Sequence, residues 1–131
     1  MKPGDSLPPF VIDSVSADAM KDWAVFLADP NPIHLDVEVV KAKGLGDKVI
    51  NQGPANVAYI VNMLRAAFPG AAIAAIDSRF VDNVYAGDRL VVTGTVTAVE
   101  CRRVTCDTVL TANGDRLVIT GTATVELKQE T

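Results

Sequence analysis

The chain has 131 residues, 49% of them hydrophobic, and a formal net charge of −4. This length fits a single domain over residues 1–131 with a proper core, and the composition gives no sign of disorder. The acidic balance, with no cluster of lysines and arginines, argues against nucleic acid as a partner. No apolar run approaches the ~18 residues of a membrane span, and the N-terminus lacks a signal-peptide pattern, so we expect a cytoplasmic protein without membrane contact.

The first half of the chain is expected to be mainly helical. Its patterns predict a short strand and three helices, at residues 10–15, 17–28, 37–43 and 54–68. The first helix has Ser16 as its N-cap and ends before Pro30, because a residue that precedes proline is pushed out of the helical region. The last helix is apolar on nearly all sides, with few polar positions such as Asn56, which predicts that it is buried.

The second half changes to a period of two, which is typical of strands with one face on a core. Strands are expected at residues 71–81, 90–98, 104–112 and 117–127, with a hairpin turn at Asn113-Gly114. A long buried helix followed by an antiparallel meander is an α+β domain, and a curved sheet around such a helix is the hot-dog architecture. The open sheet edges predict a dimer or higher oligomer.

The two cysteines, Cys101 and Cys106, stand an odd number of residues apart in a predicted strand. Their side chains should therefore face opposite sides and form no disulfide. With one histidine and no cysteine pair at ligand spacing, the sequence argues against a zinc site. We expect neither a metal nor another cofactor.

The segment that carries chemistry is Asp-Pro-Asn-Pro-Ile-His-Leu-Asp, residues 29–36, which holds the only histidine of the chain. Its two prolines fix their own φ and bias the residues before them to extended backbone, in a segment too rich in proline for a helix. The loop therefore holds Asp29, Asn31 and His34 with little freedom left to lose. An imidazole and a carboxylate in one stiff loop are the parts of a water-activating pair, although an ordinary histidine after a helix end is the alternative.

Gly53 is the second candidate, at the start of the long helix. A glycine there presents a bare backbone N–H with the helix dipole behind it, which suits a developing oxyanion or a thioester carbonyl. The alternative is a glycine needed only for the turn into the helix.

Residues 26–36 resemble the signature of the MaoC-like hydratases, which include the R-specific enoyl-CoA hydratases. The polar positions of the pattern Asp-x-Asn-Pro-x-His-x-Asp all match, and residues 86–90, Ala-Gly-Asp-Arg-Leu, resemble the segment with which the family begins a long strand. The resemblance implies a hot-dog fold and reversible addition of water to an α,β-unsaturated thioester of CoA or a carrier protein, in fatty acid metabolism.

The resemblance also implies roles for single residues. Asp29 and His34 would hold and activate the water and deliver a proton to the α-carbon, and Asn31 would orient the water or the pair. The N–H of Gly53 would stabilise the enolate oxygen. Gln52 and Asn56 would contact the substrate.

The chain departs from the family pattern at Gln52, where a histidine is usual, and at Ala28, where a glycine is common. Residues 49–53 look more like heteromeric members that hydrate bulky steroid-CoA thioesters, which leaves open a large substrate and a related hot-dog subunit as partner. A hot-dog thioesterase is another alternative, but those enzymes place an acidic residue on the central helix, and residues 54–68 have none. Candidates for the CoA phosphates are Lys41, Lys43 and Arg65.

Overall fold

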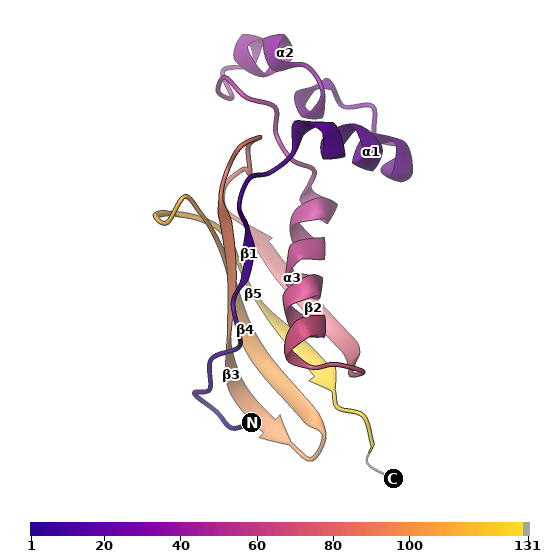
Figure 1. The fold of residues 1–131 in the computed structure, drawn as a ribbon, viewed down its shortest axis with the longest axis vertical. Helices are drawn as coiled ribbons and strands as arrows, with labels where there is room; N and C mark the ends of the chain where they lie inside the picture. The colour runs from indigo at the N-terminus through magenta and orange to yellow at the C-terminus, as the bar shows by residue number, and fades with distance from the viewer. Residues whose placement is uncertain (130–131) are drawn as a thin grey trace.

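A computed structural model describes residues 1–129 as a curved antiparallel sheet with a long helix along one face and two shorter helices beyond one end (Figure 1). The elements in chain order are β1 (Phe10–Ile12), α1 (Ala17–Leu27), the 3₁₀ helix η1 (Pro32–His34), α2 (Val37–Ala42), α3 (Gly53–Ala67), β2 (Ala72–Phe80), β3 (Leu90–Glu100), β4 (Arg103–Ala112) and β5 (Arg116–Glu126). The five strands are arranged β1-β3-β4-β5-β2, and every neighbouring pair is antiparallel.

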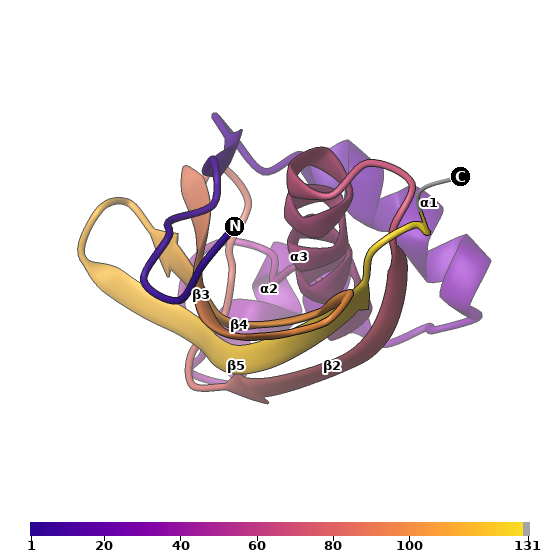
Figure 2. The same cartoon turned by 90° about the horizontal axis from the view of Figure 1, so that it is seen from below.

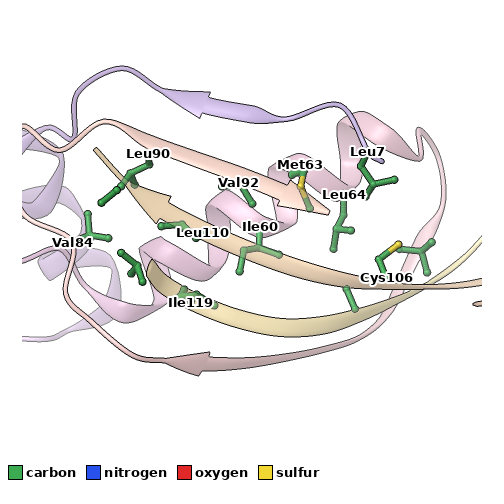
Figure 3. Close-up of a cluster of buried hydrophobic side chains, with 14 of the residues drawn as sticks. Leu7, Ile60, Met63, Leu64, Val84, Leu90, Val92, Cys106, Leu110 and Ile119 are labelled. Atoms are coloured by element: carbon green, nitrogen blue, oxygen red, sulfur yellow. The ribbon is translucent and has the colours of Figure 1, made fainter. Parts of the chain in front are cut away.

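The sheet curves around α3, which lies in its concave side (Figure 2). The core is the layer of apolar side chains between them (Figure 3). Its labelled members are Leu7, Ile60, Met63, Leu64, Val84, Leu90, Val92, Cys106, Leu110 and Ile119, all at most 3% exposed. The α+β hot-dog architecture expected from the switch in periodicity is therefore confirmed.

α3 is buried along one stripe and not on all sides. Ala55, Ile60 and Met63 have no exposed surface, whereas Pro54 and Asn62 are exposed. The single chain therefore buries the predicted helix along this stripe only, because a five-stranded sheet covers one side of a helix. The uncovered side leaves apolar surface open along α3.

Local chemistry explains where most elements begin and end. The Ser16 hydroxyl accepts a hydrogen bond from Ala19 N at 3.1 Å, as expected of the N-cap of α1. Asn113 and Gly114 take φ of 56° and 83° in the turn between β4 and β5, a backbone that these two residues tolerate well. β1 is shorter than expected and ends at Ile12, so the predicted strand at 10–15 was too long.

The strand position predicted for Cys101 was wrong. Cys101 is exposed in the turn between β3 and β4 with φ 57°, while Cys106 faces the core, and both are free thiols. Within residues 1–129, no helix combines the length and hydrophobicity needed to cross a membrane.

Candidate active site

The loop after α1 is held by its own polar side chains. One Asp29 carboxylate oxygen accepts a hydrogen bond from Asn31 N at 3.1 Å, and Asn31 Oδ1 accepts one from Ile33 N at 3.2 Å. Such Asx turns let a short polar side chain replace a backbone partner. The expectation of a non-helical segment is corrected in one detail, because η1 is a single 3₁₀ turn with Asn31 as its N-cap.

His34 lies between a backbone carbonyl and a carboxylate. The residue is 8% exposed, with Nδ1 2.6 Å from Ile50 O and Nε2 3.4 Å from Asp29 Oδ2. A carbonyl oxygen can only accept, so Nδ1 carries the proton, and Nε2 of the neutral ring is an acceptor. The fold thereby sets the tautomer of the only histidine.

This tautomer makes the gap between His34 and Asp29 suited to water. Nε2 and a carboxylate oxygen are both acceptors, so the neutral ring and the carboxylate cannot bond each other directly. A water molecule beside them can donate one hydrogen to each. If His34 gains a proton, Nε2–H can donate to the same carboxylate, so the pair can hold a proton that leaves the water.

The N-terminus of α3 leaves one backbone donor open. Pro54 has no N–H, and Ala55 N donates to Gln52 O at 3.1 Å. In the described part of the chain, the N–H of Gly53 has no hydrogen-bond partner. Gly53 is three residues after Ile50, whose carbonyl oxygen holds His34, so only a short stretch of chain separates this donor from the backbone that fixes the histidine.

Gln52 lies in the interior. Its side chain has no exposed surface, and Nε2 donates a hydrogen bond to Met20 O of α1 at 2.8 Å. Its Oε1 is buried and has no partner among the described residues. In the single chain Gln52 therefore ties α1 to the start of α3, and it is not part of an open pocket wall.

Asn56 belongs to a polar cluster that includes two residues missed by the sequence analysis, Asn51 and Tyr59. Asn51 Nδ2 donates to Asn56 Oδ1 at 2.8 Å and to the Tyr59 hydroxyl at 3.1 Å. Burial raises the pKa of Tyr59, an effect larger than the lowering by the Asn51 hydrogen bond. A signal was available, because Asn56 and Tyr59 are three residues apart on one face of a helix.

The basic residues named for the CoA phosphates are spread out. Lys41 and Lys43 are exposed at the end of α2, and Lys41 Nζ lies 3.6 Å from Glu38 Oε1. Arg65 is in the last turn of α3, twelve residues from Gly53, which corresponds to about 18 Å of helix. The structure does not bring Arg65 to the Asp29–His34 pair.

The loop between β2 and β3 forms hydrogen bonds with the backbone segment that holds His34. Asn51 N donates to Val84 O at 2.7 Å, and Ile50 forms an antiparallel bridge with Tyr85. The buried carboxylate of Asp88 accepts a hydrogen bond from Tyr85 N at 2.9 Å. The backbone that holds His34 is thus paired with a loop that is itself anchored by Asp88.

Residues 4–117 match the family described as MaoC like domain. The chain belongs to the MaoC-like domain family. A search of curated proteins finds no match to this MaoC-like chain.

Solved structures share the fold of this MaoC-like chain over nearly its whole length. The (R)-hydratase from A. caviae involved in PHA biosynthesis has a TM-score of 0.89 and 22% identity, covering 98% of both chains. The R-hydratase PhaJ1 from Pseudomonas aeruginosa has a TM-score of 0.87 and 22% identity, covering 99% of this chain and 84% of that chain. A chain of the ChsH1-ChsH2 complex from Mycobacterium tuberculosis has a TM-score of 0.85 and 20% identity, covering 96% and 98%.

Proposed function

We propose that this MaoC-like protein is a hydro-lyase, which catalyses the reversible hydration of an α,β-unsaturated acyl thioester. The observation that carries the proposal is the contact of His34 Nε2 with Asp29 Oδ2 at 3.4 Å, with Nδ1 fixed by Ile50 O. The substrate is a thioester of CoA or a carrier protein, and no cofactor takes part. Membership of a family that includes hydratases and dehydratases supports the reaction class.

In the proposed reaction the pair both removes and returns a proton. Water lies against Asp29 and His34 Nε2, and as its oxygen bonds to the β-carbon, one O–H bond breaks and the pair takes the proton. The electrons of the carbon–carbon double bond move toward the carbonyl, which becomes an enolate. The enolate α-carbon then takes a proton from the pair, and dehydration is the reverse path. Such acid/base groups contribute about 10²–10⁴-fold each.

The N–H of Gly53 stabilises the enolate oxygen in this proposal. It is an unpaired donor at the positive end of the α3 dipole, and it is fixed before the reaction begins. Asn31 acts through its hydrogen bonds within the loop, which hold Asp29 and η1 in place.

Two alternatives have weaker support. A hot-dog thioesterase of the kind considered above needs an acidic residue on the central helix, and α3 (Gly53–Ala67) has none. A non-catalytic subunit of a heteromeric hydratase does not need the Asp29–His34 pair, which is intact here. A catalytic chain that pairs with itself or with a related hot-dog subunit fits better, and a complex of two different chains is known for ChsH1-ChsH2.

The test is loss of the enoyl-thioester absorbance band on addition of the purified protein. Crotonyl-CoA and a ring-bearing enoyl-CoA serve as short and bulky substrates, and the 3-hydroxyacyl-CoA products serve to measure the reverse reaction. Hydration of either enoyl-CoA that disappears in His34→Ala supports the proposal. Hydrolysis to free CoA, measured with a thiol reagent, would replace the proposal with a thioesterase.

A further inference from the structure

Phe80 is the last residue of β2. Its side chain is on the same face of the sheet as the core residues, but the core does not bury it. It is paired with Ile119, which is paired with Leu110, which is paired with Val92. Directly opposed residues of antiparallel strands point to the same face. Ile119, Leu110 and Val92 have no exposed surface and lie between the sheet and α3 (Figure 3), whereas Phe80 is 50% exposed.

The covered part of Phe80 lies against Gly53. A Cβ placed on Gly53 would be 3.7 Å from both Cε1 and Cζ of the Phe80 ring, which is van der Waals contact. The ring is therefore beside the residue whose N–H is the open donor of the site. Half of the surface of Phe80 is exposed, and β2 is the edge strand of the sheet.

From this position we infer that Phe80 is a specificity-determining residue, whose ring forms a wall for the acyl part of the thioester beside the carbonyl group. The inference rests on the proposed function, because the carbonyl is placed by the N–H of Gly53. A hydrocarbon acyl chain gains by covering an exposed ring, whereas the pantetheine arm would lose hydrogen bonds of its amides against it. The size of residue 80 should then set the width available to the acyl group.

The experiment compares Phe80→Ala and Phe80→Trp with the wild type on crotonyl-CoA and a ring-bearing enoyl-CoA. Phe80→Ala should raise the ratio of kcat/KM for the bulky substrate to that for crotonyl-CoA by at least about tenfold, mainly through KM. Phe80→Trp should lower the same ratio. Val81→Ala is the matched control, because Val81 is the next residue and is 45% exposed but is outside this row.

A binding measurement separates this inference from the proposed reaction. Calorimetry with two saturated thioesters, butanoyl-CoA and a cyclohexyl-bearing acyl-CoA, gives the same comparison without turnover. If the wild type binds both saturated thioesters but hydrates no enoyl-CoA, the proposed reaction is wrong. The ratio of the two binding constants in Phe80→Ala, compared with the wild type, then still tests the role of Phe80. A ratio changed less than threefold in Phe80→Ala, or changed equally in Val81→Ala, overturns the inference. Phe80→Leu replaces Phe80→Ala if thermal unfolding shows the latter to be unfolded, and the same limits apply.

Discussion

At the scale of single residues, the pair formed by His34 Nε2 and the Asp29 carboxylate can be tested by substitution. We expect Asp29→Asn and His34→Ala each to lower kcat by at least about 10²-fold, because in the proposed reaction each removes a group that exchanges a proton with the substrate or water. The double variant should be no slower than the worse single variant, since residues that act as a unit are not additive. Steady-state kinetics on a confirmed enoyl-CoA measure all three.

Asp36 provides the control within the same segment. Its carboxylate accepts a hydrogen bond from Glu38 N at 2.9 Å as the N-cap of α2, and asparagine caps a helix equally well. Asp36→Asn should therefore keep near wild-type turnover. Folded Asp29→Asn with normal turnover, or an equal loss in Asp36→Asn, would contradict the assigned pair.

Ala28 carries backbone strain where the family commonly has glycine. It ends α1 with φ 51° and ψ 41°, in the left-handed region. This conformation costs a residue with a Cβ about 1–2 kcal/mol, and glycine loses part of that advantage through its freedom in the unfolded chain. Ala28→Gly should raise the free energy of unfolding by up to about 1 kcal/mol, measured by urea denaturation. A lower urea midpoint with an unchanged slope would show that the strain is relieved in some other way.

The two cysteines should differ in reactivity. Burial raises the pKa of the Cys106 thiol, and the neighbouring Asp107 carboxylate raises it further, so Cys106 stays protonated at neutral pH. Cys101 is exposed in its turn. A thiol reagent such as an aromatic disulfide should modify one thiol of the native protein quickly and the second only after unfolding. Cys101→Ser should abolish the fast phase, and a fast phase that survives this change would refute the assignment.

At the scale of elements, the loop between β2 and β3 depends on one buried carboxylate. Asp88 accepts hydrogen bonds from Tyr85 N, from Asn113 Nδ2 at 3.1 Å and from Arg116 Nη2 at 2.5 Å. The Asp88 side chain is 7% exposed and that of Arg116 is 28% exposed. Removing the guanidinium leaves a nearly buried charge without its ion pair, which is costly even where the intact pair is nearly neutral.

Arg116→Met should therefore lower the free energy of unfolding by about 2–4 kcal/mol. Asp88→Asn in the same chain should recover part of the loss, because the uncompensated charge is removed while one amide donor and acceptor remain. Denaturant unfolding of the two single variants and the double variant gives the coupling energy. Strictly additive effects would mean that the two side chains do not act as a pair in solution.

At the scale of the whole molecule, β2 is an edge strand, and one of its sides is not paired with another strand of the same chain. β2 is last in the strand order, and its exposed residues include Ala74, Ala75, Asp77 and Arg79. Asp77 and Arg79 have opposite charges and so give the strand no net charge that would oppose pairing with a second chain. Val25 and Phe26 of α1 add apolar surface, being 83% and 81% exposed. A second hot-dog chain would cover such surface.

We accordingly expect a dimer by size exclusion with light scattering, and Ala75→Lys should shift it toward monomer. The lysine charge at the β2 edge opposes strand pairing across it. Thr93→Lys, on the exposed face of β3, is the control and should leave the mass unchanged. A wild-type monomer at assay concentrations, or equal effects of the two lysines, would contradict a dimer built on this edge.

The amino-acid sequence by itself determined most of the elements and the loop that carries the chemistry. The periodicity of α3 and of β3 to β5, the cap at Ser16 and the turn at Asn113 depend on residues close together in the chain. Two prolines likewise stiffen the segment around Asp29 and His34 whatever surrounds it. Features that depend on neighbouring residues can be predicted from a single sequence. The family pattern is of this kind, because it consists of residues close together in the chain.

Only the tertiary structure decided which atoms meet. The tautomer of His34 depends on Ile50, sixteen residues away, and the position of Gln52 depends on Met20 of another helix. Phe80 reaches Gly53 through the curvature of the sheet. These contacts join residues far apart in the chain, and their geometry results from the way the helices and loops pack against one another and against the curved sheet, which no local pattern encodes.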